Sequence, residues 1–270
     1  MKATVRDLGV IGYAACWALQ QRLFEGLLEN KRRPEQANEG AGKANEGPEK
    51  ANEGAGTTQS LEAGTILLAG HPPVYTLGKS GHAENLLVDR ATLEQLGAEF
   101  FHIDRGGDIT FHGPGQLVCY PILDLERLGI GLRTYIERLE EAVIRTVAEY
   151  GIAAGRIAGA SGVWITEVPQ NETKRGLNER RDEGAAQKGG PRKICAIGVR
   201  SSRYVTMHGF ALNVATDLEW FSRINPCGFR DRGVTSILRE TGREVPMDEV
   251  KARLIRRLGE QLGLETGGRE

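Results

Sequence analysis

The 270-residue sequence has few cysteines, almost no net charge and no long apolar run. Its four cysteines, Cys16, Cys119, Cys195 and Cys227, show neither a CxxC pattern nor zinc-ligand spacing, so the sequence indicates no zinc motif and no disulfide framework. The formal net charge of −1 excludes a global field that would favour nucleic acid or an anionic membrane. No stretch approaches the roughly 18 apolar residues of a membrane helix.

Two further absences narrow the class of protein. Residues 1–10 lack a charged head followed by an apolar run, so they do not read as a signal peptide. The histidines form no metal spacing with cysteines or acidic residues. We therefore expect a cytoplasmic protein that has no metal, no cofactor, no nucleic-acid partner and no membrane partner.

What the sequence does contain is typical of a globular domain. Hydrophobic residues make up 40% and charged residues 26%. We expect residues 1–270 to form a single domain interrupted by two polar, low-complexity inserts at about 31–60 and 169–191. The first insert repeats the tetrapeptide Ala-Asn-Glu-Gly three times, at 37–40, 44–47 and 51–54, with no apolar seam.

The remaining chain alternates short apolar runs with turns. Helical periodicity predicts helices at about 13–28, 134–149 and 248–262, and Thr134 with Glu137 suggests a capping box for the second. Strands are predicted at 65–69, 74–77, 100–103, 109–111, 117–123, 162–166, 194–199 and 204–214. These elements predict an α+β fold, a mixed sheet flanked by helices.

Two residues suggest covalent chemistry. Cys227 lies between Pro226 and Gly228, in a turn unlike the apolar surroundings of most core thiols. A cysteine attacks as its thiolate, and the ordinary pKa of about 8.5 must fall for that to happen near neutral pH. Lys193 precedes an apolar strand and would supply such a cation if its side chain points inward. The alternatives are that Cys227 is a thiol of the core and that Lys193 is a solvated charge at the end of a strand.

A Gly-rich run from Arg105 to Gln116 is the second signal. His112 is followed by Gly113, Pro114 and Gly115, which suggests close approach of the backbone to another segment or to a ligand. The run is neither GxGxxG nor a Walker loop, and a turn without a ligand explains it equally well. A glycine within the strand at 204–214 likewise suggests close approach by another group.

Six segments in this order resemble the lipoyl(octanoyl) transferase family: 8–9 with 17–20, 71–78, 105–116, 193–198, 208–214 and 225–228. The resemblance implies a fold similar to the catalytic domain of biotin and lipoate protein ligases. It implies transfer of an octanoyl group from octanoyl-acyl carrier protein to a lysine of lipoyl domains, through a cysteine thioester. The acceptors implied are the lipoyl domains of 2-oxoacid dehydrogenases and the glycine cleavage H protein.

The family's functional positions fall on named residues of this chain. Its nucleophile falls on Cys227, and its pKa-lowering lysine on Lys193. The residues that would bind the substrate are Arg105, Gly106, Gly107, Asp108, Ile109, Thr110, Phe111, His112, Ala196, Ile197, Gly198, Gly209, Phe210 and Ala211. Two alternatives stay open, an ATP-dependent lipoate or biotin ligase and a catalytically silent binding protein. Cys195 we expect to be a buried structural thiol.

Overall fold

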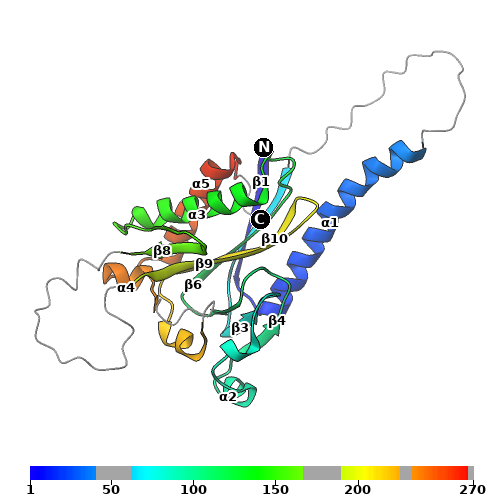
Figure 1. The fold of residues 1–270 in the computed structure, drawn as a ribbon. Helices are drawn as coiled ribbons and strands as arrows, with labels where there is room; N and C mark the ends of the chain where they lie inside the picture. Colours follow the sequence, from blue (N-terminus) through cyan, green and yellow to red (C-terminus); the bar gives the residue numbers. More distant parts are fainter. Residues whose placement is uncertain (41–61, 167–189, 226–232, 267–270) are drawn as a thin grey trace, which may run out of the picture.

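The computed structural model describes residues 1–40, 62–166, 190–225 and 233–266. Its main feature is an eight-stranded mixed sheet in the order β1-β2-β6-β10-β9-β8-β7, with β11 paired to β9 (Figure 1). The strands are β1 (Lys2–Val10), β2 (Glu62–Gly70), β6 (Gln116–Leu123), β7 (Gly155–Ile157), β8 (Ala160–Ile165), β9 (Arg192–Ser202), β10 (Val205–Asn213) and β11 (Gly233–Val234). The central strands β6, β10 and β9 are antiparallel neighbours.

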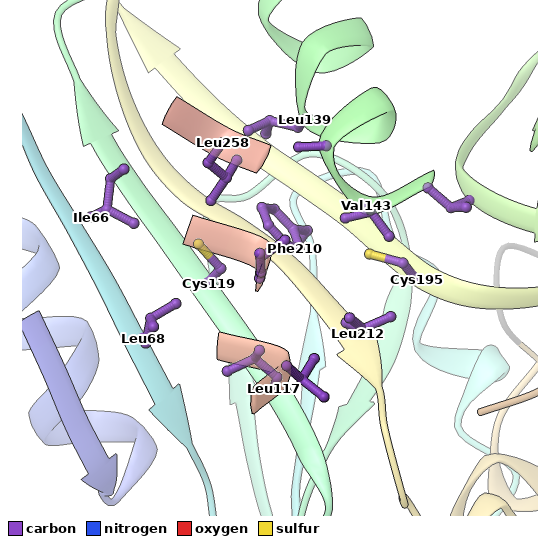
Figure 2. Close-up of a cluster of buried hydrophobic side chains, with 14 of the residues drawn as sticks. Ile66, Leu68, Leu117, Cys119, Leu139, Val143, Cys195, Phe210, Leu212 and Leu258 are labelled. Atoms are coloured by element: carbon purple, nitrogen blue, oxygen red, sulfur yellow. The ribbon is translucent and has the colours of Figure 1, made fainter. Parts of the chain in front are cut away.

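Helices cover both faces of this sheet. On one face lie α3 (Leu132–Ala148) and α5 (Met247–Leu262), and α1 (Tyr13–Gly40) lies on the other (Figure 1). Figure 2 shows the core under α3 and α5, where Leu139, Val143 and Leu258 face Phe210 and Cys195 of the sheet. A second core lies on the other face of the sheet, against α1. Because successive side chains of a strand point to opposite faces, β6 and β10 contribute residues to both cores.

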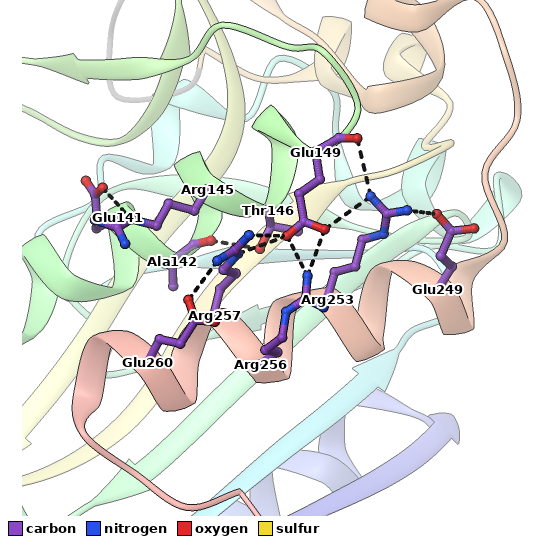
Figure 3. A network of polar contacts seen from close by, with 10 residues as sticks. All are labelled: Glu141, Ala142, Arg145, Thr146, Glu149, Glu249, Arg253, Arg256, Arg257 and Glu260. Carbon is purple, nitrogen blue, oxygen red and sulfur yellow. Dashed lines mark hydrogen bonds and ion pairs between the residues drawn. The ribbon is translucent and has the colours of Figure 1, made fainter.

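An ionic cluster at the end of α3 fastens this helix to α5. Glu149 accepts hydrogen bonds from Arg256 at 2.8 Å and from Arg257 at 2.9 Å, and it pairs with Arg253 at 3.2 Å (Figure 3). All three arginines lie on α5, so a single carboxylate at the C-terminus of α3 meets three guanidinium groups. The cluster stabilises the packing of the two helices on the sheet.

A smaller three-stranded sheet lies beside the large one. It has the order β4-β3-β5. Its strands are β3 (Val74–Leu77), β4 (Glu99–His102) and β5 (Ile109–His112). Short helices α2 (Arg90–Gln95) and α4 (Ile237–Thr241), and the 3-10 turns Ala83–Asn85 and Leu218–Arg223, complete the described elements. The loop between β4 and β5 carries the Gly-rich run toward the large sheet.

The predicted α+β arrangement is confirmed, with two local corrections. The insert was expected to begin at residue 31, but α1 continues to Gly40. Lys31 forms an ion pair with Asp124 at 2.7 Å, and this carboxylate is almost fully buried. The polarity of the sequence after residue 30 therefore predicts too early an end for this helix. Residues 41–60 and 167–189, which include most of the two expected inserts, lie outside the described residues.

The second correction concerns the start of α3. The capping box predicted from Thr134 and Glu137 is wrong, because the helix begins two residues earlier and its N-cap is Gly131. Glu137 instead accepts a hydrogen bond from Arg133 at 3.1 Å, one helical turn away. The strand β1 at the edge of the large sheet is not predicted from the sequence pattern of residues 2–10.

Candidate functional site

A narrow cavity lies between the central strands of the large sheet and the loop that precedes β5. It is lined by Lys193 and by most of the residues expected to bind substrate. These are Arg105, Gly107, Asp108, Ile109, Thr110, His112, Ala196, Ile197, Gly198, Gly209, Phe210 and Ala211. Sequence reasoning had not assigned the other lining residues to the site, namely Tyr13, Gln116, Val118, Tyr120, His208, Asn213, Phe221 and Val234.

Small residues build the floor of the cavity. Gly198 of β9 is paired with Gly209 of β10, and Ala196 is paired with Ala211. A Cβ on Gly209 would lie 2.1 Å from the carbonyl oxygen of Cys119 on β6, so this position excludes any side chain, as the glycine in the strand had suggested. Absent or minimal side chains at these positions leave a groove above the pleated sheet.

The Gly-rich loop forms the roof at one end of that groove. The amide of Gly106 donates to the carbonyl of Val199 at 3.0 Å. A Cβ on Gly198 would lie 2.7 Å from the carbonyl oxygen of Gly106, so loop and strand touch backbone to backbone. The guanidinium of Arg105 donates to the carbonyl of Thr76 at 2.7 Å, which fixes the loop to β3. The glycines thus allow the loop backbone to approach the backbone of β9, which is one of the interpretations that the sequence left open.

Two of the expected substrate-binding residues do not line the cavity. Gly106 contacts β9 through its amide and accepts a hydrogen bond from Arg105 through its carbonyl. Phe111 points into a separate core, where its ring stacks on Trp220 at a centroid distance of 5.1 Å. Alternation along β5 explains the difference, because Thr110 and His112 on either side face the cavity.

Buried polar side chains line the cavity beside His112. Its Nδ1 lies 2.8 Å from Oε1 of Gln116, and Nε2 of Gln116 donates to Oδ1 of Asn213 at 2.9 Å. Asn213 in turn donates to the carbonyl of Thr235 at 2.9 Å. Burial, together with the charge of neighbouring His71, lowers the pKa of His112 to about 3. The imidazole is therefore neutral at physiological pH.

His208 has an unusual backbone for a strand residue. Its φ is +62°, a left-handed value that is uncommon outside glycine. It pairs with Val199 of β9, and its amide donates to Oε1 of Gln20 at 3.2 Å. Its Nε2 lies 2.9 Å from the carboxylate of Asp104. Burial lowers the pKa of His208, while Asp104 opposes that shift.

Lys193 reaches the cavity through an irregularity in β9. Val163 of β8 pairs with Cys195, but the next residue, Trp164, pairs with Lys193, so Ile194 is an extra residue. This β-bulge shifts the alternation by one position. Ile194 and Cys195 both lie in the core under α3, and Lys193 faces the cavity. Cys195 is fully buried, as expected, and burial raises its pKa.

A buried ion pair holds the backbone next to Lys193. Arg192 and Glu240 form two hydrogen bonds of 2.6 Å, and the hydroxyl of Thr235 donates to the same carboxylate at 2.5 Å. The amide of Thr235 donates to the carbonyl of Lys193 at 2.9 Å. These contacts join β9, β11 and α4 at the end of the cavity where Lys193 lies.

Cys227, the expected nucleophile, lies outside the described residues. Its described neighbours in sequence both attach to the site. The amide of Asn225 donates to the carbonyl of Asn85 at 2.8 Å, and Nδ2 of Asn85 donates to Asp108, a lining residue, at 2.5 Å. On the other side, Gly233 and Val234 pair with β9 at Arg192 and Lys193.

Neither a metal centre nor a membrane span is found among the described residues. Within 1–40, 62–166, 190–225 and 233–266, no three histidine, cysteine or acidic side chains are arranged to hold a metal ion. In the same part of the chain, no helix combines the length and the apolar character needed to cross a bilayer.

Comparison with known proteins gives one family and one fold. Residues 52–259 match the lipoyl protein ligase A/B catalytic domain. The chain is 46% identical to the octanoyltransferase of Bacteroides fragilis strain YCH46, over 96% of this chain and 97% of that protein. It is 48% identical to the octanoyltransferase of Bacteroides thetaiotaomicron, over 97% of this chain and 96% of that one.

Solved structures match the fold at low sequence identity. The bipartite lipoate protein ligase of Thermoplasma acidophilum, described with its E2 lipoyl domain, aligns with a TM-score of 0.60 at 17% identity and covers 100% of this chain and 88% of that one. A lipoate protein ligase A bound with ATP aligns with a TM-score of 0.53 at 18% identity, over 76% of each chain. The expected ligase-like fold is confirmed.

Proposed function

This chain belongs to the lipoyl protein ligase A/B catalytic-domain family, and we infer that it is an octanoyltransferase of protein lipoylation. The observation that carries this conclusion is its 46–48% identity, over nearly its full length, with octanoyltransferases. It is thus an acyltransferase whose acceptors are lipoyl domains. We propose further that residues 1–270 form one catalytic domain, that the donor is octanoyl-acyl carrier protein and that a cysteine thioester forms during transfer. The cytoplasmic location stays a prediction.

The spacing of strand residues along the floor of the cavity supports an octanoyl group as the acyl chain. Ala196 is three residue steps from Val199, the partner of His208, which corresponds to about 10 Å at 3.3 Å per residue. An extended eight-carbon chain, with C–C bonds of about 1.5 Å, measures roughly 9 Å. The acyl chain would lie over Ala196, Gly198 and Gly209, with its carbonyl toward Lys193 and its methyl end toward the roof.

In the proposed first step, the thiolate of Cys227 attacks the carbonyl carbon of the octanoyl thioester. A new C–S bond forms, the C–S bond to the carrier breaks, and the carrier leaves as a thiol after taking one proton. The ammonium of Lys193 would stabilise the thiolate by its charge and supply that proton. Support for this pairing comes from the chain on both sides of the cysteine. Asn225 precedes it by two residues, and Val234 pairs with Lys193.

In the second step, the amine of the acceptor lysine attacks the acyl-enzyme. The amide C–N bond forms, the C–S bond to Cys227 breaks, and one proton leaves the amine. Lys193, neutral after the first step, would take that proton and return to its charged state. An exchange between two thioesters is nearly isoenergetic and the final amide is more stable, so the sequence of steps needs no ATP.

The mass of the intact protein after incubation with octanoyl-acyl carrier protein, without ATP, tests the proposal. We expect a gain of one octanoyl group that hydroxylamine removes and that Cys227→Ala abolishes. Lys193→Ala should slow the gain strongly, and Lys193→Arg should restore it poorly, because a guanidinium does not give up its proton. Cys195→Ala serves as the control for loss of a thiol outside the cavity. No gain, with turnover of free octanoate and ATP by Cys227→Ala, would assign an ATP-dependent ligase instead.

A further inference from the structure

The side chain of Lys193 lies on the face of an indole ring. Its Nζ is 4.6 Å from the centroid of the Trp164 ring, within the distance over which a cation is attracted to an aromatic face. The two residues are direct partners in the ladder between β8 and β9. Neither sequence spacing nor the family resemblance had indicated a role for Trp164.

Two irregular positions create this contact. The extra residue Ile194 turns Lys193 onto the same face of the sheet as Trp164, away from Cys195. Gly162, with a φ of +112°, lies beside the lysine stem, and a Cβ there would be 3.5 Å from both Cδ and Cε of Lys193. That Cβ would also be 2.5 Å from the carbonyl oxygen of Cys195. The stem thus packs closely over a residue that has no side chain.

Trp164 itself is held firmly. Its side chain is 2% exposed, and its indole Nε1 donates to the carbonyl of Ala160 at 3.0 Å. The residues on either side of it, Val163 and Ile165, are anchored in the core under α3. The ring therefore offers a fixed surface, and a cation attracted to that surface is restricted to one region of the cavity wall.

Several charged groups surround this pair. Glu140 of α3 accepts from the amide of Gly162 at 3.0 Å and from Arg156 at 2.9 Å. Arg192, next to Lys193 on β9, is paired with Glu240 of α4. Both carboxylates thus already accept hydrogen bonds from an arginine. The indole face adds attraction for an ammonium group without adding a titratable group.

We propose that Trp164 is a positioning residue for Lys193, whose ammonium its ring face holds in the charged state at the edge of the cavity. This inference rests on the proposed function, because it affects transfer only if Lys193 acts on the cysteine. The ring acts through the lysine and touches neither the octanoyl group nor the carrier.

The test compares Trp164→Leu and Trp164→Phe with the wild type in acyl-enzyme formation from octanoyl-acyl carrier protein across a range of pH. We expect Trp164→Leu to be about 3- to 30-fold slower near neutral pH, the range that a partly desolvated cation–π contact corresponds to. Its rate should also begin to fall at a lower pH on the alkaline side, since the ammonium is no longer stabilised. Trp164→Phe should lie between, because a phenyl face attracts a cation less strongly.

The matched control is Tyr150→Leu. There Arg253 lies 4.6 Å from the ring centroid, the same distance as in the lysine–indole pair, but the contact joins the turn after α3 to α5, and neither residue lines the cavity. Tyr150→Leu should lower stability in urea and leave the pH profile of transfer unchanged. A merely structural role of Trp164 would give the same result as this control.

A readout that does not need activity separates this inference from the proposed function. Reductive methylation with isotope-labelled formaldehyde lets the Lys193 amine be titrated by NMR in the wild type and in Trp164→Leu. A titration at lower pH in the variant supports the contact even if transfer is unaffected, and in that case the role of Lys193 in the proposed function is wrong. Superimposable titration curves and superimposable pH profiles would overturn the inference.

Discussion

Gly209 offers the sharpest test of how the cavity floor is built, through the substitution Gly209→Ala. In β10, its Cβ position lies 2.1 Å from the carbonyl oxygen of Cys119 and 2.8 Å from Cδ of Pro121. Ordinary contact between nonbonded heavy atoms needs about 3.5 Å, so β6 and β10 would have to separate by more than an ångström. The obstructing atoms belong to backbone and to a proline ring, and neither rotates away.

The magnitude follows from where those strands lie. β6 and β10 are adjacent in the middle of the large sheet and supply residues to both cores. Overpacking of a well-packed core costs about 1–3 kcal/mol and occasionally more. Because the clash is with a central strand, we expect Gly209→Ala to lose about 3 kcal/mol of unfolding free energy. Octanoyl transfer should fall with it, since the added methyl and the displaced strands close the groove.

Urea unfolding followed by tryptophan fluorescence measures the loss, with Gly155→Ala as the matched control. Gly155 lies in the edge strand β7, and nothing lies within 4 Å of its Cβ position. The control should stay within about 0.5 kcal/mol of wild type. If Gly209→Ala were as stable as that control, the close approach of β6 to β10 would be wrong, and the description of the floor would fail with it.

Three further predictions concern the surroundings of the cavity. Glu240→Gln should lower the unfolding free energy by about 3 kcal/mol, because it leaves the charge of Arg192 buried without its carboxylate; urea unfolding and the transfer rate measure the effect. Stability should fall as the pH drops below about 6.5, because burial lowers the pKa of His112 to about 3. His112 then binds a proton in the unfolded chain but not in the folded chain, so the unfolding free energy falls by about 1.4 kcal/mol per pH unit. Urea midpoints at pH 7 and pH 5, with and without His112→Gln, measure this effect. Cys195 should resist iodoacetamide in the folded protein, since burial raises its pKa, and Cys195→Ala should keep transfer near the wild-type rate.

Much of the site could be predicted because it depends on residue types that can be recognised in the sequence itself, namely glycines in a short run and a charge beside an apolar strand. The glycines in the run from Arg105 to His112 predict close approach of the backbone to another group, and the structure places this run against β9. Lys193 stands out as a charge beside an apolar strand, and it does line the cavity. Whether Cys227 joins it stays a prediction, because that residue lies outside the described part of the chain.

The parts that could not be predicted depend on contacts made across the fold. β1 pairs with β2 across sixty residues, and its weak alternation gives little local sign of a strand. The ion pairs of Lys31 with Asp124 and Glu126 anchor α1 at the position where the insert was expected to begin, and the polarity of the sequence cannot reveal these contacts. The family resemblance implied that Phe111 binds substrate, but strand alternation directs its ring to the opposite side.

The position of Lys193 shows why an apolar strand pattern misleads at a functional site. Counting back from Gly198 and Ala196, which face the cavity, regular alternation would place Ile194 in the cavity and Lys193 in the core with Cys195. A charged ammonium in that core would lose most of its solvation with no apolar gain. One extra residue in β9 resolves the conflict: Ile194 enters the core, and Lys193 comes to lie over Trp164 at the cavity wall. The bulge therefore serves stability and placement of the cation at once, because regular pairing of the same sequence would move the residues of β9 that precede Cys195 to the opposite face.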